Sequence, residues 1–196
     1  MQGHRAMHPR GAAIWLLLAG CAWLWPPAAA QAAEPYFEVR AADSRLRDAV
    51  YLLDADIDFQ LSAAAQEALQ NGIPLVLEVE IRVERPREWV WPDTVATLSQ
   101  RYRLQYHALS DRYVVHNLNT DQRQSFAHLD QAQAALGRLR DFPLLDRRLL
   151  QADAPYQVKL RAGLVIEALP TPIRLWAYAS EQWRLDSAWY IWQLHP

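Results

Sequence analysis

The stretch Leu75–Arg85, which reads LVLEVEIRVER, decides the fold class of this chain. Apolar and polar side chains alternate along it, so one face carries aliphatic groups and the other carries charges. A period of two is typical of a β-strand with one buried and one wet face. We therefore predict a strand of an antiparallel sheet, because such sheets commonly keep one face in water.

The same alternation recurs on both sides of this stretch. It is found in three further segments, Leu53–Leu61, Arg101–Ala108 and Tyr156–Ala168. Residues that favour turns separate the strands, at Arg47-Asp48, Pro86–Pro92, Ser110-Asp111, Asn117–Asp121 and Pro170–Pro172. His107 and His116 flank one of these turns, and a two-residue loop there would place them on one face, whereas a three-residue loop would place them on opposite faces.

Two short helices interrupt the strands. Ser62 is suited to cap a helix over Ala63–Gln70, which Asn71-Gly72 would end. The second helix is predicted over Leu129–Leu139, where apolar residues follow helical spacing until Pro143 stops it. The expected fold is mainly β (a β-rich α+β protein), an antiparallel β-sandwich with two short helices.

The first 33 residues have the features of a secretory signal peptide. Arg5 and Arg10 precede the apolar run Gly11–Trp25, and the small residues Ala28–Ala33 follow it. The apolar run is shorter than the roughly 20 residues that a membrane span needs. We therefore expect residues 34–196 to form a single β-rich domain that is exported to the periplasm.

Cys21 leaves the mode of export open. Leu18-Ala19-Gly20-Cys21 fits the pattern in which a second peptidase cuts before a cysteine that carries lipid. The apolar run continues past Cys21, whereas a lipoprotein usually turns polar soon after this residue. Simple cleavage near Ala30 to Ala33, lipidation at Cys21 and an uncleaved anchor are the three alternatives.

Charge and cysteine content exclude several function classes. The leader contains two of the 20 basic residues and none of the 22 acidic ones, so its removal changes the net charge from −2 to −4. A negative chain is a poor partner for nucleic acid. Cys21 is the only cysteine, so a cleaved protein has no disulfide, thiol nucleophile or cysteine-bound metal. We also expect no cofactor and no metal.

The order of several motifs resembles a known family. The motifs are LLDADIDFQLS (52–62), ALQNGIPLVLEVEI (68–81), RYRLQYHALSDRYVVHNL (101–118), SFAHLDQAQAALGRL (125–139) and WRLDSAWYIWQL (183–194). Together they resemble the proteobacterial domain of unknown function 4390, DUF4390. The resemblance implies an exported envelope protein with no established activity, whose gene often lies beside that of a membrane sensor kinase of the nitrogen-regulation type. The chain departs from the family pattern at Ala49, where a turn glycine is expected, and at His128, where a serine or threonine cap is usual.

Asp54, Asp56 and Asp58 form an acidic ladder on one face of a predicted strand. Alternate residues of a strand are about 6.6–7 Å apart, which lies in the range of the two carboxylates of an inverting glycosidase. All three cannot bind one calcium ion, because the ends of the ladder are roughly 13 Å apart. The alternative is a wet face with cross-strand arginine partners, for which Arg82, Arg101 and Arg103 are candidates.

Trp89 and Trp91 share one side of an extended segment at the end of a hairpin. If exposed, they would stack on a sugar ring or contact a membrane surface, and if buried they would close one end of the sandwich. The C-terminal segment Trp189–Leu194 is apolar on both faces, which is typical of a strand covered on both sides.

The leading functional hypothesis is a non-enzymatic interaction module that binds a protein or envelope component. The candidate binding residues are Trp89 and Trp91, together with Arg101 and Arg103 on a charged face. A membrane sensor kinase is the partner that the family resemblance implies. The alternatives are a glycan or cell-wall hydrolase that uses two residues of the acidic ladder, and a structural envelope assembly factor with its aromatic C-terminus buried. We identify no catalytic residue, because no set of nucleophile, base and oxyanion donors can be assembled.

Overall fold

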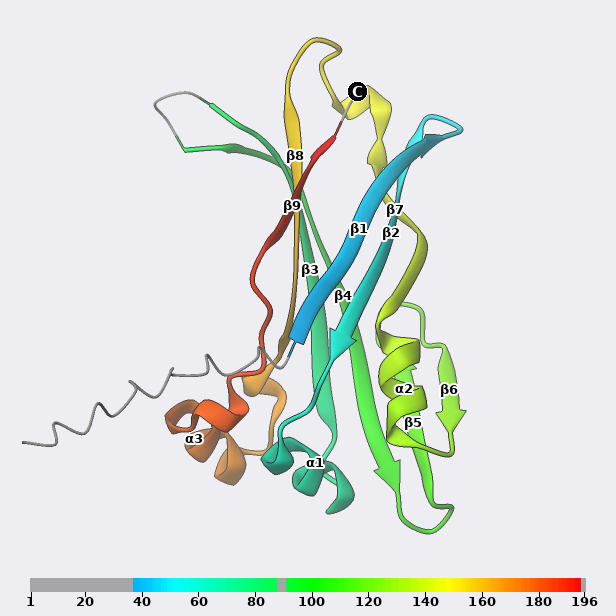
Figure 1. Cartoon of the computed structure of the whole chain (residues 1–196), viewed down its shortest axis with the longest axis vertical. Coiled ribbons are helices and arrows are strands. Elements are labelled where there is room, and N and C mark those ends of the chain that lie inside the picture. Colours follow the sequence, from blue (N-terminus) through cyan, green and yellow to red (C-terminus); the bar gives the residue numbers. More distant parts are fainter. Residues whose placement is uncertain (1–36, 88–90, 195–196) are drawn as a thin grey trace, which may run out of the picture. The chain divides into compact units, whose positions relative to one another are not determined.

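The computed structural model describes residues 37–87 and 91–194. All of these residues belong to one compact unit, Glu34–Pro196. Two antiparallel sheets form this unit (Figure 1). The mainly β, antiparallel fold class expected from the sequence is confirmed.

The larger sheet has six strands and is built around β3 (Leu75–Arg85), the stretch that alternates most strictly. Every second residue from Leu75 to Val83 is aliphatic, points inward and is buried, whereas Glu78, Glu80 and Arg82 lie on the outer face. The strand order is β6-β5-β4-β3-β8-β9, with β4 (Asp93–His107), β5 (Arg112–Asn117), β6 (Arg123–Phe126), β8 (Tyr156–Leu164) and β9 (Tyr190–Leu194).

The smaller sheet has the order β1-β2-β7, with β1 (Phe37–Arg47), β2 (Val50–Phe59) and β7 (Arg138–Asp146). A register shift between Val39 and Ala41 interrupts the β1–β2 ladder. Bulges of this kind bend a strand and increase its twist. The acidic ladder lies on β2, as expected.

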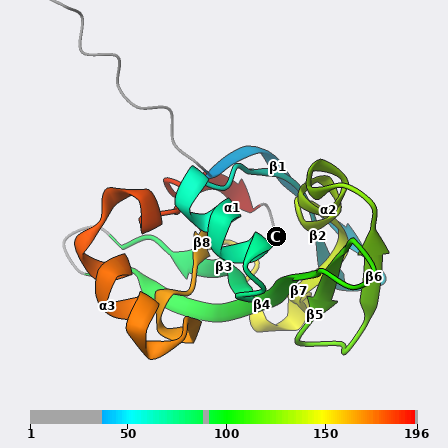
Figure 2. The same cartoon turned by 90° about the horizontal axis from the view of Figure 1, so that it is seen from below.

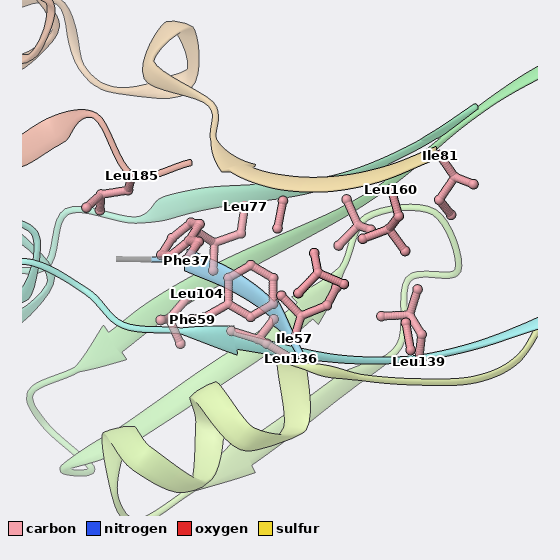
Figure 3. Packing of buried hydrophobic residues seen from close by; sticks show 14 of the residues in the cluster. Phe37, Ile57, Phe59, Leu77, Ile81, Leu104, Leu136, Leu139, Leu160 and Leu185 are labelled. Atoms are coloured by element: carbon pink, nitrogen blue, oxygen red, sulfur yellow. The ribbon is translucent and has the colours of Figure 1, made fainter. Parts of the chain in front are cut away.

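One core joins the two sheets. Phe37 and Phe59 of the small sheet meet edge to face, with ring centroids 4.9 Å apart, and they lie opposite Leu77 and Leu104 of the large sheet (Figure 3). Leu160 of β8 extends the same cluster and is fully buried. The inward residues of alternating strands therefore supply the core that a domain without disulfides requires.

Within the described residues, three α-helices and three short 3-10 helices connect the strands. Helices α1 and α3 lie at the same end of the sheets, and α2 packs beside β5 and β6 (Figures 1 and 2). The bounds are α1 Ala63–Gln70, α2 Leu129–Leu136, α3 Thr171–Ala179, η1 Arg147–Leu149, η2 Ile166–Ala168 and η3 Glu181–Trp183.

Helix α1 has the predicted bounds. The Oγ of Ser62 accepts a hydrogen bond from the Ala65 amide at 3.2 Å, as an N-cap should. Gly72 follows the helix with a φ of 81°, in the region that favours glycine.

Three details of the predicted elements are wrong. Helix α2 ends at Leu136, and Leu139 and Pro143, expected in the helix and at its stop, lie in β7. The strand expected to reach Ala168 ends at Leu164 and continues into η2. The turn expected at Pro170–Pro172 is the N-terminus of a third helix, because proline is tolerated in the first helical turn.

Candidate functional site

The end of the β3–β4 hairpin presents Trp91 to solvent, where it is 89% exposed. Asp93 fixes the base of this hairpin end, because its carboxylate accepts hydrogen bonds of 2.8 Å from both Arg85 and Arg87. The alternative in which Trp91 is buried and closes one end of the sandwich is therefore wrong. Trp89 lies outside the described residues.

The two halves of the expected binding surface lie far apart. Trp91 and Arg103 are separated by 12 positions along an extended segment, which corresponds to about 40 Å at about 3.3 Å per residue. Arg101 donates a hydrogen bond of 3.0 Å to Glu78 of the neighbouring strand. Arg103 has no ion pair among residues 37–87 and 91–194. The hairpin end and the charged face of β4 are therefore separate places on the molecule.

His107 and His116 share the outer face of the large sheet. The connection between β4 and β5 is Ala108–Asp111, which has four residues. Like a loop of two residues, a loop of four places His107 and His116 on the same face of the sheet. Because His107 pairs with Arg112, four positions from His116, the two imidazoles are about 13 Å apart along the strand. They cannot share a metal ion at that separation.

Each carboxylate of the acidic ladder is held by an arginine of a neighbouring strand. Asp54 pairs with Arg45 of β1 and also accepts a hydrogen bond of 2.8 Å from the Asp141 amide. Asp56 pairs with Arg140 of β7 at 2.5 Å, and Asp58 pairs with Arg40 of β1. The ladder is thus a set of cross-strand ion pairs on the outer face of the small sheet.

The arginines expected to pair with the ladder do not pair with it, and Arg82 has other partners. The Arg82 side chain donates to Glu80 at 2.6 Å and lies over the Trp189 ring, 5.0 Å from its centroid. Arg161 approaches the same ring at 4.6 Å. The expectation failed because β2 pairs with β1 and β7, whereas Arg82, Arg101 and Arg103 belong to the other sheet.

The outer face of β3 and β8 is electrically balanced. Glu80 accepts hydrogen bonds from Arg161 at 2.8 Å and from Arg82, and Glu84 pairs with Lys159 at 2.7 Å. Burial alone would raise the pKa of each glutamate, but the hydrogen bonds and charges of these partners outweigh it and lower the pKa.

The C-terminal aromatic residues are covered largely by the domain itself. Trp183 is buried, and the indole N–H of Trp192 donates a hydrogen bond of 3.0 Å to Ser44 Oγ on the opposite sheet. Strand β9 is nevertheless an edge strand, and Ile191 on its outer face is 51% exposed. The expectation that both faces of this segment are covered is therefore wrong.

Helix α3 carries an exposed apolar stripe that the sequence reasoning missed. Leu175 and Trp176 are 70% and 77% exposed, and Tyr178 beside them is 57% exposed. The apolar residues of the stripe follow the spacing i, i+3, i+4, i+7, which places them on one face of the helix. They are Pro172, Leu175, Trp176 and Ala179. This spacing is visible in the sequence and would have revealed the helix if Pro170–Pro172 had been taken as its start.

The opposite face of α3 is also apolar. Ala177 is buried, Ile173 packs against the core, and α3 has no acidic residue. A helix that is apolar all round is normally covered on every side. Arg174 is its one charged residue, and its buried Nε has no hydrogen-bond partner among the described residues.

The described part of the chain lacks both a three-residue metal cluster and a long apolar helix. It contains no group of three or more histidine, cysteine, aspartate or glutamate side chains placed to bind one ion. None of its helices has the length and apolar character needed to cross a membrane.

The fold and these surfaces define the class of the protein. It is an antiparallel β protein with two sheets, and its helix α3 presents apolar side chains to solvent. The chain belongs to the family described as domain of unknown function (DUF4390), whose model matches residues 34–193. No curated protein and no solved structure matches the chain.

Proposed function

We propose that this domain is a non-enzymatic interaction module of the cell envelope and that α3 is its docking helix. The observation that carries the proposal is the outward stripe of α3, where Leu175, Trp176 and Tyr178 are all more than half exposed. Exposed apolar surface of this kind marks interaction sites in proteins that otherwise bury such side chains.

The side chains of α3 indicate what kind of surface a partner would present to it. An apolar segment would cover Leu175 and Trp176, and a carboxylate on that segment would pair with the guanidinium of Arg174, the one charged residue of the helix. Tryptophan and tyrosine dominate binding energy at protein interfaces, and arginine often accompanies them. The partner we propose is the extracytoplasmic segment of a membrane sensor kinase, which an exported domain would meet at the membrane.

Binding measurements with the purified protein test this proposal. The probe is the purified extracytoplasmic segment of a membrane sensor kinase of the nitrogen-regulation type, the partner that the family resemblance implies, and the readout is the dissociation constant by biolayer interferometry. We expect binding at about 10 μM or tighter. Trp176→Gln should weaken it about tenfold or more, because truncating a central tryptophan commonly costs over 1.4 kcal/mol.

Leu149→Gln is the matched control, since Leu149 is 63% exposed but lies on η1. Its affinity should equal that of the wild type. Absence of binding by the wild type, or equal affinities for the Trp176 and Leu149 variants, would overturn the proposal.

The acidic ladder supports no second function. A glycan hydrolase would need a carboxylate free to reach the substrate, and Asp54, Asp56 and Asp58 are each engaged by an arginine. Trp91 and Arg103 remain candidates for further contacts with an envelope component.

A further inference from the structure

Three adjacent strands of the large sheet place a row of basic side chains on its outer face. Arg103 of β4 is opposite His116 of β5, which in turn is opposite Arg123 of β6. Directly opposite residues of neighbouring strands have side chains on the same face, about 5 Å apart. The row therefore spans about 10 Å from Arg103 to Arg123.

The row borders a hollow in the surface. Its volume is about 160 Å³, and it is lined by Arg103, Gln105, His107, Val114, His116 and Arg123. None of these residues is acidic. The floor of the hollow is the outer surface of β4 and β5, between the register pairs Arg103–His116 and His107–Arg112.

Positive charge is in excess at this part of the sheet's outer face, as far as the described residues show. On β3 and β8 each basic side chain has an acidic partner, as in the pairs Glu80–Arg161 and Glu84–Lys159. Arg103, by contrast, has no ion pair among the residues that the structure describes.

One carboxylate comes close to the row from the adjoining turn. Asp121 accepts a hydrogen bond from His116 Nε2 at 2.5 Å, and Arg123 approaches the same oxygen at 3.5 Å. Asp121 is therefore already bound to two members of the row but leaves Arg103 without a partner. A single-charge carboxylate is too small to occupy the whole row.

We propose that this row, Arg103–His116–Arg123, binds a phosphate group. A phosphate dianion matches the two guanidinium charges, and guanidinium groups hold phosphate oxygens through paired hydrogen bonds. His116 would donate to a third oxygen once Asp121 withdraws. Asp121 then acts as an internal competitor for the same donors. The proposal is independent of the docking helix, which lies on other elements.

Phosphate titration of the purified protein tests the site. The probe is inorganic phosphate in a buffer that contains no other oxyanion, and the readouts are isothermal titration calorimetry and amide chemical shifts of β4–β6. We expect saturable binding to the wild type. Arg103→Gln should weaken it about tenfold, and Asp121→Asn should tighten it several-fold, because the competitor loses its charge.

Arg148→Gln is the control, since Arg148 is an exposed arginine outside this sheet whose side chain has no ion pair among the described residues. Its phosphate affinity should equal that of the wild type. If Asp121 only supported the local structure, its substitution would not tighten phosphate binding. Weaker binding by the Arg103 variant together with tighter binding by the Asp121 variant therefore identifies the site.

Two further arms define the source of the phosphate. Vesicles of phosphatidylcholine with and without phosphatidic acid test a lipid phosphate, and acetate tests a carboxylate. Binding to inorganic phosphate or to phosphatidic acid vesicles, lost in the Arg103 variant, supports the proposal and identifies a free or a lipid phosphate. Binding to neither, equal binding of acetate, or unchanged affinity in the Asp121 variant would overturn it.

Discussion

Two consecutive residues in the β1–β2 turn have positive φ angles, Asp48 at 49° and Ala49 at 66°. Because Arg47 pairs with Val50, the turn has two residues, and two-residue hairpin turns with positive φ at both positions favour glycine. Aspartate tolerates this backbone region, but the Cβ of alanine is strained there by about 1–2 kcal/mol. The family pattern, which led us to expect glycine at position 49, thus reflects a real backbone requirement.

Ala49→Gly should stabilise the protein. Relief of the strain exceeds the entropy that glycine adds to the unfolded chain, so we expect the free energy of unfolding to rise by about 0.5–1 kcal/mol. Urea denaturation monitored by tryptophan fluorescence measures the change. Ala64→Gly in α1 is the control and should lower the value by about 1 kcal/mol. Equal losses in both variants would show that the turn carries no strain.

Glu80→Gln should lower stability at neutral pH and much less in acid. The pKa of Glu80 is lowered in the folded protein, because the hydrogen bonds from Arg161 and Arg82 outweigh the effect of burial. The ionised form is thus stabilised by folding, so its contribution is present above the unfolded pKa and is lost as pH falls through the folded pKa. We expect a loss of about 1 kcal/mol at pH 7.

Urea denaturation at several pH values between 7 and 3 provides the measurement for Glu80. The difference between wild type and variant should shrink below about pH 4.5, the ordinary glutamate value. Glu181→Gln is the control, because its pair with Arg184 is exposed and adjacent on one turn. A difference that stays constant with pH would rule out the ion pairs as its cause.

The acidic ladder shows how much of a set of ion pairs can be predicted from the sequence of one strand. The alternation of Asp54, Asp56 and Asp58 could be predicted from sequence, and arginine partners could be expected from it. Their identity could not, because it depends on strand order: the partners come from β1 and β7, and neither segment was recognised as a strand. The period of two specifies which residues face water but not which strands are neighbours.

At the scale of elements, the end of α2 is set by a tertiary contact. A Cβ added at Gly137 would lie 1.9 Å from the carbonyl oxygen of Ile57 on β2, so only glycine fits there. The Ile57 amide also donates a hydrogen bond of 2.8 Å to the Gly137 carbonyl. Helical spacing of apolar residues continued to Leu139 in the sequence, and the backbone of another strand overrides it.

Gly137→Ala should therefore be strongly destabilising. We expect a loss of at least about 2 kcal/mol in the free energy of unfolding, because backbone atoms must move to admit the methyl group. Gly163→Ala is the matched control, since a Cβ there would meet its nearest atom at an ordinary 3.8 Å. Chemical denaturation of both variants gives the comparison, and a mild effect at position 137 would mean that β2 and α2 do not lie as close as described.

At the scale of the whole molecule, the core and the apolar surface have separate roles. The buried cluster draws on both sheets and on inward residues such as Ala177 of α3, whereas Leu175 and Trp176 lie outside it. The alternating pattern predicted the two sheets because burial imposes it. The helical spacing in Thr171–Ala179 could have predicted the helix but not the exposure of its stripe, because an apolar face is ordinarily assigned to the core.

The double substitution Leu175→Gln and Trp176→Gln should therefore leave the folded protein intact. Glutamine has helix propensity close to that of leucine, and both side chains are mostly in water, so we expect a change within about 0.5 kcal/mol. Ala177→Gln, on the inner face of the same helix, should cost about 1–3 kcal/mol because the core is overpacked. Thermal and urea denaturation of the two variants would measure this contrast. If the double variant instead lost more than about 2 kcal/mol, the stripe would belong to the domain's own packing, and α3 would no longer qualify as a docking helix. A stable double variant that no longer binds the sensor segment would assign the stripe to the partner, because the exposed residues would then contribute to binding and not to folding.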